Sequence, residues 1–221
     1  MRIGLFGGTF DPIHIGHLRA ALEVKQGFGL DRIIFIPAAL PPHKKGGQVA
    51  DAADRLKMVE LGVSGYSGFS VSDAELRRSG PSYSIDTINH FKTSGDPASE
   101  ILFISGLDAF LEIDTWKSYR DLLRQIAFIV IARPMFDGSD TSLRWKRLED
   151  FINAKISADY RFCESSAGFV HSGSKPIYAF DVTSLDISST RIRELVKTGQ
   201  PITYLVPESV EDYVKSRGLY L

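Results

Sequence analysis

The sequence predicts an α/β fold, in which helices cover a doubly wound parallel sheet and a small helical part, from about residue 187 to 221, closes the chain. Short apolar, β-branched runs alternate with stretches of helical period, and glycines and prolines mark the turns between them. No internal repeat or low-complexity linker divides the sequence. We therefore expect residues 1–221 to form a single domain.

The strands are predicted where short apolar runs end at turn residues, because such runs suit a sheet that is buried on both faces. These runs cover residues 2–6, 32–36, 69–71, 101–104, 128–132 and 177–182.

The helices are predicted where apolar residues recur with the 3.6-residue period. Between the strands they cover residues 15–26, 53–63, 84–92, 119–124 and 142–153. Two more, at about residues 189–197 and 207–217, make up the C-terminal helical part, and the second begins at Pro207 and ends before Gly218. Residues 40–50 and 158–175 have poor periodicity, and we expect mobile loops there.

Composition excludes several classes of protein. The 26 basic residues nearly balance the 27 acidic ones, so no overall field draws the chain to nucleic acid or to an anionic membrane. The single cysteine, Cys163, excludes an intrachain disulfide and a multi-cysteine metal site. No apolar run is long enough for a signal peptide or a membrane span. We expect a cytoplasmic protein with neither a membrane nor a nucleic-acid partner.

The first predicted strand leads into a glycine turn, Gly7-Gly8-Thr9-Phe10-Asp11-Pro12-Ile13-His14-Ile15-Gly16-His17, and a helix follows. Ligands of open α/β sheets bind beyond the carboxyl ends of the strands, where helix N-termini attract phosphate. The turn has neither the G-x-G-x-x-G nor the G-K-[ST] pattern, which disfavours a dinucleotide oxidoreductase and a P-loop NTPase.

His14 and His17 are three residues apart, so both imidazoles lie on one face of a first helical turn, with Gly16 leaving room between them. Together they can donate to a phosphate. An isolated H-x-x-H is more often polar surface or core, and metal binding is a further alternative. Directly after a glycine-rich strand exit, however, the H-x-G-H pattern indicates adenylyl-forming chemistry on a Rossmann-like sheet.

The residues from Gly8 to Pro12, with His14-Ile15-Gly16-His17, resemble the signature of the nucleotidyltransferase superfamily. Class I aminoacyl-tRNA synthetases share His-Ile-Gly-His, but the chain lacks their K-M-S-K-S loop and the length for an anticodon-binding domain. Four further segments resemble bacterial nicotinate mononucleotide adenylyltransferases in order and approximate spacing: Pro41-Pro42-His43-Lys44, Ser82-Tyr83-Ser84-Ile85-Asp86-Thr87, Gly106-Leu107-Asp108 with Trp116-Lys117, and Ile187-Ser188-Ser189-Thr190-Arg191-Ile192-Arg193.

This resemblance implies adenylyl transfer from ATP to nicotinate mononucleotide, giving nicotinate adenine dinucleotide and pyrophosphate, a step of NAD biosynthesis. A phosphate monoester has its second pKa near about 6, so the nucleophile is already anionic and needs no general base. Magnesium, Mg²⁺, is expected to arrive with ATP rather than in a protein cage. Nicotinamide mononucleotide or pantetheine phosphate as acceptor, and a non-catalytic nucleotide-binding module, are the alternatives. A homo-oligomer is left open.

The resemblance also assigns roles to residues of this sequence. The catalytic residues are His14, His17, Lys44 and Arg193. The ATP-binding residues are Gly7, Gly8, Gly16, Gly106, Asp108, Arg133, Ser188, Ser189 and Thr190. The acceptor-binding residues are Thr9, Phe10, Tyr83, Ser84, Asp86, Thr87 and Trp116, and no residue is assigned to a metal.

Each assignment has a plainer alternative. Lys44 and Arg193 could be solvated surface charges, Asp108 and the serines could be helix caps, and Trp116 could be core. Asp11 is expected to orient the glycine turn rather than to bind metal.

Overall fold

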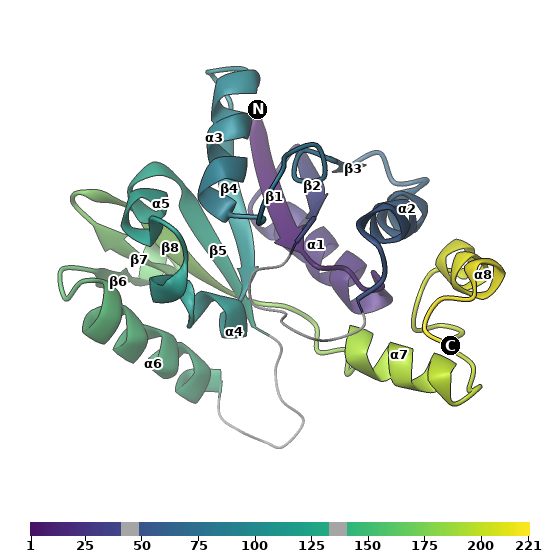
Figure 1. Ribbon diagram of the computed structural model, residues 1–221. Helices are drawn as coiled ribbons and strands as arrows, with labels where there is room; N and C mark the ends of the chain where they lie inside the picture. Colours follow the sequence, from purple (N-terminus) through teal and green to yellow (C-terminus); the bar gives the residue numbers. More distant parts are fainter. Residues whose placement is uncertain (41–48, 133–140) are drawn as a thin grey trace. The chain divides into compact units, whose positions relative to one another are not determined.

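A computed structural model describes residues 1–40, 49–132 and 141–221 (Figure 1). Its contacts divide the chain into two compact units. The turn unit comprises Phe6–Ser82 and Leu185–Leu221, and the hairpin unit comprises Met1–Leu5 and Tyr83–Ser184. Strand β1 (Arg2–Gly8) contributes its first residues to the hairpin unit and its last to the turn unit. The single domain remains a prediction.

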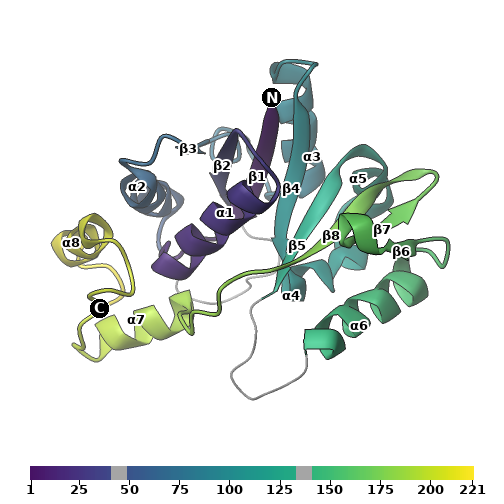
Figure 2. The ribbon, with the colours of Figure 1, turned by 180° about the vertical axis from the view of Figure 1, so that it is seen from behind.

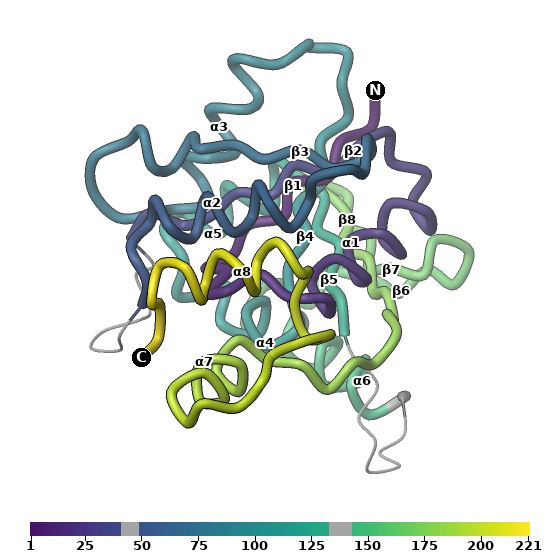
Figure 3. The backbone as a smooth tube through the Cα atoms, turned by 90° about the vertical axis from the view of Figure 1, so that its right-hand side faces the viewer, coloured from purple at the N-terminus to yellow at the C-terminus, as the bar shows by residue number. Residues whose placement is uncertain are grey.

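The turn unit has the strand order β3-β2-β1. Strand β2 is buried over five consecutive residues, as expected for a strand with both faces covered, and it pairs in parallel with β3. Helix α8 runs alongside α2, as Figure 3 shows. The elements of this unit after β1 are α1 (Ile15–Gly27), β2 (Arg32–Pro37), α2 (Ala52–Val63), β3 (Phe69–Val71), α7 (Ser189–Lys197) and α8 (Glu208–Arg217).

The hairpin unit has the strand order β1-β4-β5-β8-β7-β6. All six residues of β5 are buried, and β5 pairs in parallel with both β4 and β8. The helices of this unit are α3 (Ser84–Ser94), α4 (Leu107–Phe110), α5 (Tyr119–Gln125) and α6 (Thr141–Phe151), with short helical turns η1 (Ile113–Thr115), η2 (Ile152–Ile156) and η3 (Glu164–Ser166). Its strands after β1 are β4 (Glu100–Gly106), β5 (Ala127–Ala132), β6 (Arg161–Cys163), β7 (Gly168–His171) and β8 (Ser174–Asp181).

The predicted loop at residues 158–175 is wrong. This segment holds β6 and β7 and the start of β8, and the pairings β6–β7 and β7–β8 are antiparallel (Figure 2). The sheet is therefore mostly, and not wholly, parallel. The prediction failed because β6 and β7 have only three and four residues, too short for a clear apolar run, and β6 carries exposed side chains.

The predicted strands and helices are confirmed to within three residues at each end, whereas the predicted loop at residues 40–50 lies mostly outside the described residues. Their positions were correct because hydrophobic period is a local property of the sequence. Helix α6 passes into a π-helical turn at Ile152–Ile156, and its Arg144 and Trp145 bind the Asp181 carboxylate at the end of β8. Within the described ranges, no helix combines the length and the apolar character that crossing a membrane requires.

Candidate functional site

The glycine turn connects β1 to α1 and is supported by one buried ring. A Cβ atom on Gly8 would lie 2.9 Å from Cζ of Phe10, so only glycine fits there without a shift. Phe10 is 3% exposed, has a φ of 49°, and packs edge-to-face against Phe6 and His17. The structure thus places Phe10 beneath the turn, with its ring packed against Gly8 and His17.

The two histidines of the turn lie together. Their rings stack with centroids 3.6 Å apart and an interplanar angle of 24°. The backbone N–H of His14, which is buried, donates to Nδ1 of His17 at 3.3 Å. With Nδ1 as the acceptor of this bond, a neutral His17 imidazole carries its proton on Nε2. His17 is partly exposed, so an anion can approach its ring.

Two amides in the first turn of α1 have carbonyl partners. The N–H of Ile15 donates to the Leu205 carbonyl at 2.9 Å, and that of His17 donates to the His14 carbonyl at 2.9 Å. The expectation that first-turn amides bind phosphate therefore does not extend to these two. An anion at this helix end would therefore rely on the two imidazoles and on the helix dipole rather than on the Ile15 and His17 amides.

Asp11 lies at the centre of a buried charge network. Its side chain accepts a hydrogen bond from the Tyr220 hydroxyl (2.8 Å) and one from the Ala50 N–H (3.2 Å). Arg193 donates from Nη1 to the Asp11 backbone carbonyl (2.8 Å), and the same nitrogen lies 3.5 Å from Oδ2 of the carboxylate. Asp11 is 1% exposed, whereas the Arg193 side chain retains 23% of its exposure. Arg193 is thus anchored at the turn and still reachable from solvent.

The start of α7 is fixed to the same turn by its hydroxyl groups. Ser189 Oγ donates to the Pro12 carbonyl at 2.9 Å, and Thr190 Oγ1 accepts from Arg193 Nη2 at 3.4 Å. Ser188 Oγ accepts from the Arg191 N–H and caps the helix, as the plainer alternative expected. These contacts anchor the start of α7, and with it Arg193, at the glycine turn that also carries the histidine pair.

Arg55, which the sequence reasoning missed, binds four backbone carbonyls. It is 1% exposed, and its donors reach the carbonyls of Thr9 (2.9 Å), Ala38 (2.6 Å), Ala39 (3.1 Å) and Ala50 (2.9 Å). Burial lowers the pKa of Arg55, and the nearby Asp11 charge opposes that shift.

A sequence signal for Arg55 existed. It stands three and four residues before the buried Met58 and Val59, on the apolar face of a predicted helix. A charged residue in that position requires buried partners.

In the hairpin unit, Gly106 and Asp108 lie at the carboxyl end of β4, where α4 begins. A Cβ on Gly106 would meet no atom within 4 Å, so packing alone does not require glycine there. Asp108 is exposed in the first turn of α4. The position leaves its carboxylate available as an acceptor for a hydroxyl group.

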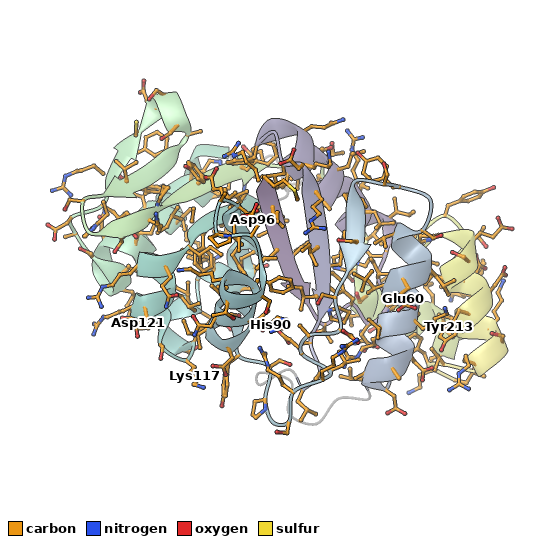
Figure 4. The ribbon with its side chains drawn as sticks, turned by 90° about the horizontal axis from the view of Figure 1, so that it is seen from above. Glu60, His90, Asp96, Lys117, Asp121 and Tyr213 are labelled. Carbon is orange, nitrogen blue, oxygen red and sulfur yellow. The ribbon has the colours of Figure 1, made fainter. Side chains whose placement is uncertain are left out.

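Two of the predicted acceptor residues of this unit contact a lysine, Lys117, which is labelled in Figure 4. Its Nζ lies 3.1 Å from the Asp86 carboxylate and 4.7 Å from the centroid of the Tyr83 ring. Thr87 is buried, and its hydroxyl donates to the Tyr83 carbonyl at 3.4 Å. Trp116 is half-buried, with its ring edge-to-face to Phe103. Lys117 is the cation that the site assignment omitted.

Lys44 and Arg133 lie outside the described residues. Gly7 and Thr9 are half-buried in the turn, Gly16 is buried in α1, and Ser84 is half-buried as the first residue of α3. Among residues 1–40, 49–132 and 141–221, no group of three or more His, Cys, Asp or Glu side chains could hold a metal ion. The turn unit thus offers imidazole and guanidinium donors to an anion.

The comparisons with known proteins agree with this chemistry. Residues 5–195 match the family model described as cytidylyltransferase-like. A protein of Desulfatibacillum aliphaticivorans named "Probable nicotinate-nucleotide adenylyltransferase" is 45% identical, with all of both chains covered. A protein of the same name from Pelobacter propionicus is 42% identical, covering all of this chain and 98% of that one.

The fold also matches a solved structure. It is that of Plasmodium falciparum nicotinic acid mononucleotide adenylyltransferase complexed with NaAD, which superposes with a TM-score of 0.72 at 19% identity and covers 99% of this chain and 97% of that one. At this identity the match shows a shared fold.

Proposed function

The chain belongs to the cytidylyltransferase-like family and, within it, to the nicotinate-nucleotide adenylyltransferases, and we propose that His14, His17 and Arg193 carry out its adenylyl transfer. The enzyme transfers the adenylyl group of ATP to nicotinate mononucleotide in NAD biosynthesis. An oxygen of the mononucleotide phosphate attacks the α-phosphorus of ATP. The bond from that phosphorus to the β-phosphate oxygen breaks, and pyrophosphate leaves with the electron pair.

The observation that carries the proposal is the glycine turn itself, which holds the stacked histidine pair and, at the Asp11 carbonyl, anchors the Arg193 guanidinium. The attacking phosphate is already anionic, so the protein has to align two anions and stabilise charge that develops on the leaving pyrophosphate. His17 Nε2 and the Arg193 guanidinium are donors suited to that charge, and preorganised donors of this kind lower the barrier. His14 supports His17 through the ring stack and supplies the second imidazole.

We assign the β- and γ-phosphates of MgATP to Arg193 and, on the resemblance alone, to Lys44. Mg²⁺ enters as part of this substrate, bridging phosphate oxygens. Asp108 is assigned to a ribose hydroxyl. The remaining ATP contacts are assigned to Gly7, Gly8, Gly16, Gly106, Arg133, Ser188, Ser189 and Thr190.

The acceptor is assigned to residues at the start of α3 and to Trp116. The half-buried Trp116 ring has a face on which a pyridine ring can stack. Tyr83, Ser84, Asp86, Thr87 and Thr9 complete the assignment. Lys117 is a cation beside this group, which favours an acceptor that carries a carboxylate.

This arrangement favours nicotinate mononucleotide over its amide counterpart. The two acceptors stack alike, so polarity must separate them. A carboxylate only accepts hydrogen bonds, whereas an amide NH₂ needs an acceptor. The Asp86 carboxylate is already paired with Lys117 at 3.1 Å, so the NH₂ stays poorly paired, at a cost of about 1–3 kcal/mol. We expect a preference of roughly ten- to a hundredfold in kcat/KM.

The test measures pyrophosphate release with MgATP and, in turn, nicotinate mononucleotide, nicotinamide mononucleotide and pantetheine phosphate. Release with nicotinate mononucleotide and formation of the dinucleotide are expected. Equal or better use of the amide would refute the acceptor preference. No release with any acceptor, while MgATP still binds, would favour a non-catalytic nucleotide-binding module.

A further inference from the structure

The last residues of the chain return to the glycine turn. Helix α8 ends at Gly218, which has a φ of 60°, and Leu219 donates its N–H back to the Val214 carbonyl. Tyr220 then adopts a φ of 68°. A non-glycine residue rarely adopts this left-handed region, and it persists there when its surroundings hold it. The conformation indicates that contacts of the Tyr220 side chain fix this end of the chain.

The contact that fixes it is a hydrogen bond to the carboxylate of Asp11. The Tyr220 hydroxyl donates to Oδ1 of Asp11 at 2.8 Å, across 209 positions of sequence, and lies 3.9 Å from the Met58 sulfur. Burial, followed by the Asp11 charge, raises the pKa of Tyr220. The hydroxyl therefore keeps its proton over the working pH range and always acts as a donor.

The two Asp11 oxygens have different partners. Oδ1 accepts from Tyr220 and from the Ala50 N–H, both by hydrogen bonds. Oδ2 faces Arg193 Nη1 at 3.5 Å, which is longer than a hydrogen bond, because Nη1 donates to the Asp11 backbone carbonyl at 2.8 Å. The carboxylate thus lies close to the guanidinium without forming a hydrogen bond to it.

We propose that Tyr220 is a positioning residue for adenylyl transfer: its hydroxyl holds Oδ1 of the buried Asp11 carboxylate in place and so keeps Arg193 available to the nucleotide. This inference rests on the proposed function. Without the hydroxyl, a carboxylate that is 1% exposed loses one of two hydrogen-bond donors. Arg193, whose Nη1 lies 3.5 Å from Oδ2, is then drawn into a close ion pair with the carboxylate and away from the phosphates.

A second tyrosine in the same unit provides a matched control. Tyr213, labelled in Figure 4 on α8, donates from its hydroxyl to Oδ1 of Asp54 at 2.7 Å, and Arg217 Nε lies 3.2 Å from the same oxygen. This Tyr–Asp–Arg group has the same chemistry. It joins α8 to α2. Removing the Tyr213 hydroxyl tests the loss of such a bond away from the site.

The experiment compares Tyr220→Phe and Tyr213→Phe with the wild-type chain in pyrophosphate release under MgATP and nicotinate mononucleotide. Tyr220→Phe should lower kcat/KM for MgATP about tenfold, which equals about 1.4 kcal/mol of activation free energy. Tyr213→Phe should stay within about twofold, although both variants lose a similar bond and should show similar falls in Tm. In an Arg193→Ala background, Tyr220→Phe should cause no further loss, because both changes act on one group.

Three results would overturn the inference: Tyr220→Phe as active as the wild type, equal activity losses in Tyr220→Phe and Tyr213→Phe, or losses that add fully on Arg193→Ala. If the wild-type chain is active and any of these three results is found, the proposed function stands and Tyr220 has no part in it. An inactive wild-type chain would instead refute the proposed function, on which the inference rests.

Discussion

Arg55→Lys tests whether the buried guanidinium holds the turn unit together. Arg55 reaches four carbonyls on three stretches of chain: Thr9, the pair Ala38 and Ala39, and Ala50. A lysine keeps the charge, yet its single nitrogen cannot span these stretches, so we count three hydrogen bonds as lost. The four carbonyl residues are half-buried, and water can reach part of them, so each lost bond is taken at about 1 kcal/mol.

The sum is a fall of about 3 kcal/mol in the free energy of unfolding, or roughly 6–12 °C in Tm for a chain of this size. Urea unfolding followed by circular dichroism measures the first, and a thermal scan the second. Lys57→Met, on the same helix, is the control: Lys57 is half-exposed in a 3.5 Å ion pair with Glu60, so its removal should cost less than about 0.5 kcal/mol. The free energy of unfolding of Arg55→Lys could instead lie within about 1 kcal/mol of the wild-type value, which corresponds to the loss of one hydrogen bond. That result would refute the argument from four carbonyl contacts.

Three further changes test other parts of the structure. His17→Ala should lower kcat by about two orders of magnitude or more, because it removes a preorganised donor, with Tm little changed; steady-state kinetics and a thermal scan measure both. Gly8→Ala should lower the free energy of unfolding by about 1–3 kcal/mol, since its Cβ would meet the buried Phe10 ring at 2.9 Å. Gly106→Ala, whose Cβ would have no atom within 4 Å, should leave urea unfolding unchanged and weaken MgATP binding. Hydrogen bonding, chiefly from Lys215, lowers the pKa of Glu211 in the folded chain. The stabilisation by its carboxylate is therefore fully present above the unfolded pKa of about 4.3 and is lost as the pH falls through the folded pKa. Glu211→Gln should therefore be less stable than the wild type at neutral pH, and urea midpoints should converge in acid.

Each of these has an outcome that counts against it. Wild-type kcat in His17→Ala would remove that imidazole from catalysis. Equal stability of the two glycine variants would mean that the Phe10 ring moves aside. A stability difference in Glu211→Gln that stays constant from neutral pH into acid would show that the carboxylate charge is not its source.

Most secondary structure followed from the sequence because periodicity is local. The glycine turn and the His14–His17 pair followed for the same reason, since three residues on a helix set a fixed geometry. The hairpin of β6 and β7 did not, because its strands are too short for a period and are defined by pairing with β8.

The sequence by itself determined the fold class, the glycine turn and the class of chemistry, because residue type and short spacing carry that information. Only the tertiary structure decided how the turn is held. Arg55 spans carbonyls up to 46 positions away, and Tyr220 reaches Asp11 across 209. Contacts at such separations leave no periodic trace in the sequence, since the folded sheet and helices alone bring these groups within hydrogen-bonding distance.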